Sequence, residues 1–181
     1  MIRRGFTLIE LLVTISIIAL LLGIALPALS YARAAGLRAN CAGQLKGVGV
    51  GVQSYLNDHK NIMPYVASLP SAGISSYPSL AEVFKSYLDS PHGLECVADA
   101  GGDRKDLPGQ RYFDTEGSSY MFNDFLCGKD PSTGFLAKAW GDVNVFVMYD
   151  YEPFHGAAGS NGSCNYLFAD GHVTDLANVN P

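Results

Sequence analysis

The stretch Gly5-Phe6-Thr7-Leu8-Ile9-Glu10-Leu11-Leu12-Val13 decides how the rest of this chain is interpreted. Glu10 stands at the start of an apolar run, and no other charged residue occurs between it and Arg33. A carboxylate at the edge of a bilayer core costs roughly 2.5 kcal/mol or more when nothing pairs with it. A partner or a role for the Glu10 carboxylate is therefore expected.

The apolar run is long enough to cross a membrane. Residues 11–29 would form a helix about 28 Å long at 1.5 Å per residue. Arg3 and Arg4 precede the run, so the positive-inside rule places the N-terminus in the cytoplasm. Residues 32–34 (Ala-Arg-Ala) match the cleavage site of an ordinary secretory signal. However, the run is longer than a typical signal core, and a signal peptide would have no use for Glu10.

Processing after Gly5 offers Glu10 a role. Cleavage there leaves Phe6 with a free α-amine, four residues from Glu10. When copies pack side by side, the carboxylate of one can pair with the amine of its neighbour, which neutralises two charges in a medium of low dielectric constant. Self-assembly would thus make the glutamate tolerable.

Together with Pro27 in the apolar run, the segment closely resembles the class III leader of type IV pilins and pseudopilins. The resemblance implies that a prepilin peptidase cuts between Gly5 and Phe6 and methylates the new amine of Phe6. It also implies that Glu10 sets the register of subunits during assembly. Pro27 is expected to kink the helix, because proline removes an i→i−4 hydrogen bond.

The helical pattern continues beyond the membrane segment. Apolar residues recur at spacings of three and four, although four glycines weaken this part of the helix by up to about 1 kcal/mol each relative to alanine. The stripe consists of Leu37, Cys41, Leu45, Val48, Val52 and Tyr55. We expect a leader (1–5), a transmembrane and assembly helix (6–32), its continuation packed on the head (33–57), and an α+β head (58–181).

Within the head, local signals predict a few elements around a small antiparallel sheet. Ser79 and Glu82 form a capping-box pattern at the start of a short helix. Residues 94–110 are polar and rich in glycine and aspartate, which indicates a surface loop. Strands are expected at 119–122 and 144–149, and a hairpin at 164–169 and 172–176, turning at Asp170-Gly171.

Residues 165–173 (Asn-Tyr-Leu-Phe-Ala-Asp-Gly-His-Val) are similar to the close of a large bacterial family of pilin-like proteins, related to the secretion pseudopilin G group. That family carries a C-terminal His-spacer-Asp-Gly signature, which here corresponds to His155, Asp170 and Gly171. The spacer in this chain encloses fourteen residues and is longer than usual in the family.

Four cysteines occur without a CxxC pair. In an exported protein an even number favours two disulfides, and four cysteines allow three connectivities. Cys41 and Cys96 lie in segments that resemble landmarks of the same pilin-like family. The resemblance and the order along the chain favour the pairs Cys41–Cys96 and Cys127–Cys164.

The head is acidic, with seven Lys and Arg against sixteen Asp and Glu from Asp58 onward. Such a surface repels phosphate, so we expect no nucleic-acid partner, but it leaves room for cations. Asp150, Asp170 and Asp175 are candidate Ca²⁺ ligands, because secretion-type pseudopilins often hold calcium in a C-terminal loop. The simpler interpretation is that Asp170 makes the turn. Histidines are expected at the surface or in strand pairs, and zinc is disfavoured because cysteine and histidine are scattered along the chain.

No GxSxG, HExxH, P-loop or Rossmann motif is present, so we do not expect an enzyme. The expected function is that of a structural subunit in a pilus-like or pseudopilus assembly of the type IV pilus or type II secretion kind. Its partners would be the prepilin peptidase, other pilin subunits and the inner membrane, crossed once, with the head in the periplasm or in an extracellular filament. The alternative is a monomeric, membrane-tethered binding protein that uses the leader only for targeting.

Overall fold

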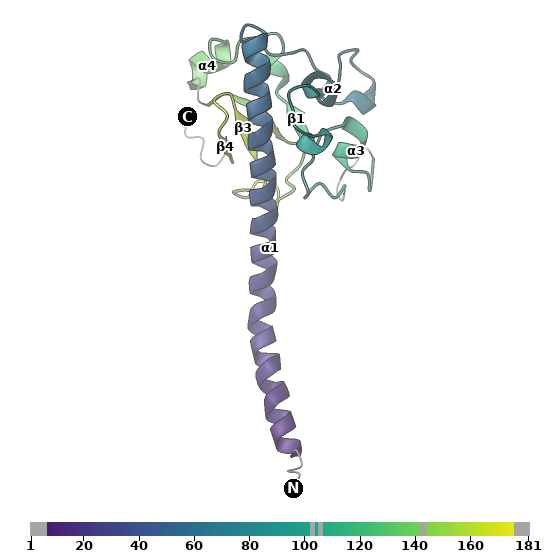
Figure 1. Ribbon diagram of the computed structural model, residues 1–181, viewed down its shortest axis with the longest axis vertical. Coiled ribbons are helices and arrows are strands. Elements are labelled where there is room, and N and C mark those ends of the chain that lie inside the picture. The colour runs from purple at the N-terminus through teal and green to yellow at the C-terminus, as the bar shows by residue number, and fades with distance from the viewer. Residues whose placement is uncertain (1–6, 102–103, 105–106, 142–143, 176–181) are drawn as a thin grey trace. The chain divides into compact units, whose positions relative to one another are not determined.

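The computed structural model describes residues 7–101, 104, 107–141 and 144–175. Its contacts divide the chain into two compact units, residues 1–36 and residues 37–181, and each is described by itself. One helix, α1 (Leu8–Asp58), contributes its first part to the N-terminal unit and its second part to the head (Figure 1). The predicted long helix is therefore confirmed.

In the head, α1 presents one buried face. Four members of the predicted stripe, Cys41, Leu45, Val48 and Val52, are at most 2% exposed. Leu37 at its start remains 37% exposed, and Tyr55 at its end is partly buried. Leu56, which was not in the stripe, is buried in place of Tyr55. This face packs in a single core with side chains of the sheet and of a short helix, among them Phe84, Tyr120, Phe122, Val147 and Leu167.

Two of the four glycines in this part of α1 lie in the packed interface. A Cβ atom at Gly49 would come within 2.8 Å of the Leu167 side chain, and one at Gly51 within 2.8 Å of the backbone oxygen of Tyr87. Gly43 and Gly47 are exposed, with open space where a Cβ would stand. The loss of helix propensity at the buried pair is therefore compensated by close approach, which the sequence pattern does not reveal.

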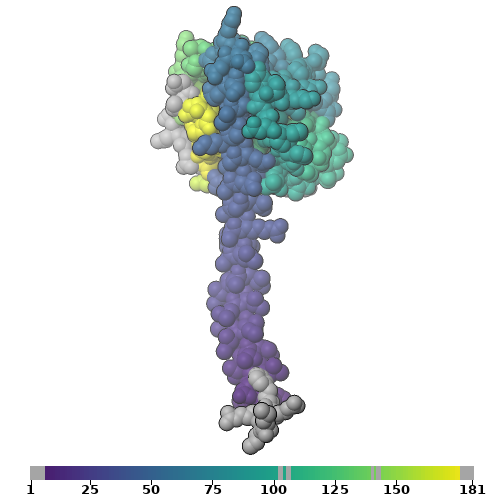
Figure 2. Space-filling model, in the orientation of Figure 1, coloured from purple at the N-terminus to yellow at the C-terminus, as the bar shows by residue number. Residues whose placement is uncertain are grey.

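The sheet has four antiparallel strands in the order β1-β2-β3-β4. Their bounds are β1 Tyr120–Phe122, β2 Phe146–Asp150, β3 Tyr166–Phe168 and β4 Val173–Thr174. The last two form the predicted hairpin, in which Gly171 has φ 89° and His172 O accepts a hydrogen bond from Phe168 N. Figure 2 shows this hairpin beside α1, where Gln53 Nε2 donates to Ala169 O at 2.5 Å.

Short helices surround the sheet. The predicted capping box is confirmed, because Ser79 and Glu82 exchange both hydrogen bonds at the start of α2 (Leu80–Phe84). The sequence did not predict α3 (Tyr112–Glu116) or α4 (Phe135–Trp140), which are too short to show a helical period. The described part of the head also contains the 3₁₀ segments η1 (Pro70–Ala72), η2 (Pro91–Leu94) and η3 (Asp124–Leu126).

Candidate functional site

The N-terminal unit has no hydrophobic core among its described residues. From Leu8 to Leu29 every large apolar side chain is roughly half exposed or more. By length and composition this part of α1 is able to cross a membrane, and it fits a membrane-anchored protein. Its exposed apolar side chains would be unfavourable in water, so we expect lipid or other helices to cover them.

Glu10 has a local partner that the sequence analysis did not identify. Thr7 precedes the first turn of α1, and Glu10 accepts hydrogen bonds from Thr7 N at 2.8 Å and from Thr7 Oγ1 at 2.7 Å. Glu10 N in turn donates to Thr7 Oγ1 at 3.3 Å. This reciprocal arrangement is a capping box, which satisfies backbone donors at the helix start. Glu10 therefore begins the helix as well as carrying a charge into the apolar segment.

The predicted processing residues, Gly5 and Phe6, lie outside the described residues, so cleavage and methylation stay predictions. Pro27 lies inside α1, and Ser30 Oγ donates to Pro27 O at 2.8 Å. The kink expected at Pro27 likewise stays a prediction.

One of the two expected disulfides forms. Cys41 on α1 is bonded to Cys96, with Cα atoms 5.2 Å apart and both side chains fully buried. The expected pair Cys127–Cys164 is wrong, because both are free thiols. Cys127 lines a surface hollow with Tyr65, whereas Cys164 lines a different hollow in the loop before β3. Order along the chain therefore predicted a pair that the fold separates.

The C-terminal signature residues divide between two places. Asp170 lies at the exposed hairpin turn, where it accepts from His172 N at 3.0 Å, as its turn role requires. His155, expected at the surface or in a strand pair, is instead buried in the loop after β2: its side chain is 1% exposed. His155 Nε2 lies 3.4 Å from Asp150 Oδ2 and 3.6 Å from Cys96 Sγ. The fold thus brings His155 against the disulfide and against the end of β2.

Burial controls the electrostatics of this cluster. Removal from water raises the pKa of Asp150 to about 7, although Asn165 N donates to its Oδ2 at 2.7 Å. Burial, and then the charge of Arg38, lower the pKa of His155. The imidazole is therefore neutral near pH 7, beside a carboxyl group that titrates there.

The three candidate calcium ligands have different partners. Asp150 faces His155, Asp170 pairs with His172, and Asp175 forms an ion pair with Arg38 at 3.0 Å. The calcium site stays a prediction. The sequence argument was that cysteine and histidine are too scattered along the chain to form a metal site. For one set of residues this argument is wrong, because the fold brings them together. Potential ligand atoms of Cys41, Cys96 and His155 all lie within 4.8 Å of one another.

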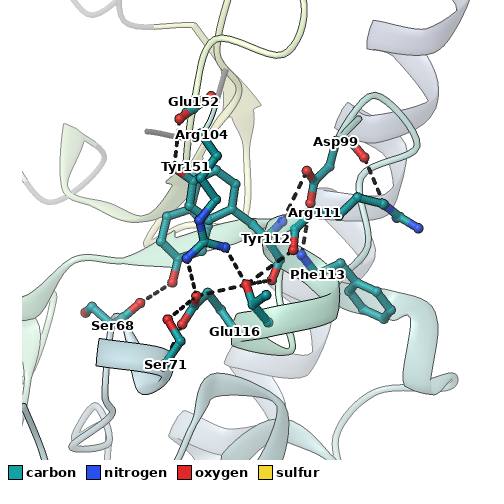
Figure 3. Close-up of polar contacts among 11 residues, drawn as sticks. Ser68, Ser71, Asp99, Arg104, Arg111, Tyr112, Phe113, Glu116, Tyr151 and Glu152 are labelled. Carbon is teal, nitrogen blue, oxygen red and sulfur yellow. Dashed lines mark hydrogen bonds and ion pairs between the residues drawn. The ribbon is translucent and has the colours of Figure 1, made fainter. Parts of the chain in front are cut away.

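A second buried polar cluster, centred on Arg104, occurs in the segment expected to be a surface loop (Figure 3). Arg104 Nη2 lies 2.6 Å from Glu116 Oε1, and both side chains are fully buried. The guanidinium also lies 4.2 Å from the centre of the Tyr112 ring. Glu116 accepts further hydrogen bonds from Ser71 N at 2.9 Å and Ser71 Oγ at 2.6 Å. No local pattern marks Arg104 as buried, so sequence reasoning missed it.

This network orders the region rather than opening it to a ligand. Asp99 accepts a hydrogen bond from Phe113 N, which joins the loop to the start of α3 (Figure 3). It also accepts from Ser119 Oγ, which joins the loop to the residue before β1. Tyr112 stacks on Tyr151 with ring centres 4.4 Å apart. These two aromatic rings therefore pack against each other within the head.

Comparison with known families gives one match: residues 1–26 match the prokaryotic N-terminal methylation motif. Neither a curated protein nor a solved structure matches the chain. The similarity thus covers the leader and most of the apolar segment, and the C-terminal signature keeps the status of a resemblance. The motif at the start of the chain and the α+β pilin-like fold that follows it thus support a pilin-like protein of the prepilin type.

Proposed function

We propose that the protein is a structural subunit of a pilus-like or pseudopilus assembly of the type IV pilus or type II secretion kind. The observation that carries the proposal is the first part of α1, where an unbroken apolar surface follows a single carboxylate. In this proposal the prepilin peptidase cleaves between Gly5 and Phe6 and methylates Phe6. The subunit crosses the inner membrane once, with its head in the periplasm or in an extracellular filament.

The capping box sharpens the role of Glu10. Within one chain, Thr7 satisfies hydrogen-bonding capacity of the carboxylate, yet its negative charge has no cationic partner among residues 7–36 as described. Cleavage after Gly5 creates a positive charge four residues away. Pairing this amine with Glu10 of a neighbouring subunit removes both charges from the apolar medium. Helix packing in an assembly then covers the exposed apolar side chains.

The alternative is a monomeric, membrane-tethered protein whose acidic head binds a ligand. Both functions use the same leader and the same anchor. What distinguishes the subunit from the tethered monomer is whether the N-terminal helices associate side by side. Neither function assigns catalysis or nucleic-acid binding to the chain.

The test separates the charge of Glu10 from its capping role. Glutamine at a capping-box position retains the hydrogen bonds but not the charge, so Glu10→Gln should abolish filament recovery while the helix still begins at residue 8. Thr7→Ala is the matched control: it removes the cap, which is worth about 1 kcal/mol, and keeps the charge. Assembly is measured in the native host by shearing, electron microscopy and in-membrane cross-linking.

The N-terminal residue and mass are measured first on the wild-type protein. A chain that begins with methylated Phe6 and cross-links into ladders that Glu10→Gln abolishes supports the subunit proposal. A processed wild-type chain that stays monomeric supports the tethered alternative. Normal assembly by Glu10→Gln would refute the charge-pairing argument.

A further inference from the structure

The disulfide region contains more donor atoms than a disulfide needs. Cys41 Sγ, Cys96 Sγ and His155 Nε2 lie within 4.8 Å of one another, and Asp150 Oδ2 lies 3.4 Å from His155 Nε2. Two sulfurs, one imidazole and one carboxylate are the ligand types that bind zinc in proteins. All four belong to the head, and they come from α1, the segment after η2, the end of β2 and the loop that follows it.

Two of the separations between these atoms fit tetrahedral coordination. With Zn–S near 2.3 Å and Zn–N and Zn–O near 2.0 Å, a tetrahedral centre places sulfur and nitrogen about 3.5 Å apart, and nitrogen and oxygen about 3.3 Å apart. The observed distances are 3.6 Å from Cys96 Sγ to His155 Nε2 and 3.4 Å from His155 Nε2 to Asp150 Oδ2. Two edges of the coordination tetrahedron therefore already have the required length.

The same cluster contains buried polar atoms without partners. Asp150 Oδ1 and His155 Nδ1 have no hydrogen-bond partner among the described residues, and the two side chains are 0% and 1% exposed. A buried polar atom left unpaired is costly, and each such atom in a native protein requires an explanation. The disulfide offers no strong donor or acceptor to these groups. A cation held by Asp150 Oδ2 would offset the charge of the buried carboxylate, although the unpaired Oδ1 and Nδ1 are not the atoms that would bind it.

We infer that, in its dithiol form, the head binds one Zn²⁺-type ion through Cys41, Cys96, His155 and Asp150. Four protein ligands fill a tetrahedral site and leave no open position, so the ion would be structural. Metal and disulfide exclude each other, because the same two sulfurs serve both. The inference goes beyond the proposed function and does not depend on assembly of subunits.

The chemistry balances in both directions. The chain is synthesised with free thiols, and binding the ion displaces one proton from each of them. Oxidation to the disulfide removes two electrons from the two thiolates, to an acceptor such as another disulfide, and the ion loses two of its four ligands. In the assay, a phosphine cleaves the S–S bond, takes the oxygen of one water molecule, and leaves both sulfurs as thiols.

Cobalt is a suitable probe, because tetrahedral Co²⁺ with thiolate ligands has visible ligand-field bands and a near-ultraviolet charge-transfer band. Full-length protein in detergent micelles is reduced anaerobically with a phosphine and titrated with Co²⁺, and Zn²⁺ is then added in competition. We expect both sets of bands at one ion per chain, their loss on adding Zn²⁺, and no bands in the disulfide form.

Two variants and one control assign the ligands. His155→Ala and Asp150→Asn should each weaken Co²⁺ binding at least about tenfold, since each removes a ligand. Both keep the disulfide, so their folding is checked by circular dichroism before reduction. A variant with Cys127→Ser and Cys164→Ser together removes the free thiols and should give wild-type bands. Absence of bands from the reduced wild-type protein, or their loss from the control variant alone, would overturn the inference.

Discussion

The buried ion pair between Arg104 and Glu116 gives the sharpest prediction about stability. Both side chains are fully buried, and Glu116 keeps Ser71 and Thr115 as further donors. Arg104→Ala removes the cationic partner that this carboxylate has in the described part of the chain. Loss of one member of a buried pair costs about 3–5 kcal/mol, because it leaves an uncompensated charge.

This change is large enough to measure by thermal unfolding. The head spans residues 37–181, and for a domain of this size each 1 kcal/mol shifts Tm by roughly 2–4 °C. We therefore expect Arg104→Ala to lower Tm by about 6–20 °C. Thermal unfolding of the full chain in detergent, monitored by circular dichroism, measures this change. The matched control is Arg111→Ala. Arg111 pairs with Glu95 and donates to Asp99 O, but the two charged side chains are 33% and 22% exposed, so water screens this pair and its loss should cost less than that of the fully buried pair.

The same pair predicts a pH dependence. Burial raises the pKa of Glu116, but hydrogen bonds from Ser71, Arg104 and Thr115 outweigh it, so the folded-state pKa lies below the ordinary value of 4.5. A depressed folded-state pKa contributes stability that is present above pH 4.5 and is lost as the pH falls through the folded-state value. Glu116→Gln should flatten this acid limb of the plot of Tm against pH.

Equal Tm losses in Arg104→Ala and Arg111→Ala would refute the argument that burial makes the Arg104–Glu116 pair the more important one for stability.

Two further predictions concern α1 and its covalent link to the head. Gly43→Ala should raise stability by up to about 1 kcal/mol, because its Cβ enters open space and improves helix propensity, whereas Gly51→Ala should destabilise the head, because its Cβ meets the backbone oxygen of Tyr87 at 2.8 Å. Urea unfolding of both variants checks this, and a stabilised Gly51→Ala would contradict it. Replacing Cys41 and Cys96 together by serine opens a loop with a sequence separation of 55, which predicts a loss of about 4 kcal/mol in the metal-free protein. Guanidinium unfolding measures it, with Cys127→Ser as the control that should change stability by less than about 1 kcal/mol.

Features with a local cause were predictable from the sequence. The capping box at Ser79 and the Asp170-Gly171 turn depend on residues within three or four positions of one another, and both are present. The long helix was predictable because its apolar stripe repeats over many turns. Thr7 and Glu10 also match the capping-box pattern, T-x-x-E, and form it. This capping role was predictable too, but the sequence analysis considered only the charge of Glu10.

Features that depend on distant residues were not predictable. His155 is buried because it meets Cys96, which lies 59 positions earlier, and Asp150, at the end of a strand. Arg104 is buried because Glu116 and Ser71, from separate elements, surround its charge. A polar residue in a glycine-rich segment is normally solvated, and only tertiary partners reverse that expectation. The predicted pairing of Cys127 with Cys164 was wrong because the distance between two cysteines also depends on how distant segments fold together.

The position of the disulfide follows from where burial begins on α1. Cys41 is the first buried residue of the helix, and the apolar side chains before it are exposed. The Cys41–Cys96 bond joins α1 to the segment after η2 inside the head, and one turn earlier the Arg38–Asp175 ion pair joins α1 to the residue after β4. Near the start of its packed part, α1 is thus held by an ion pair and a covalent bond, before the buried apolar positions from Leu45 onward.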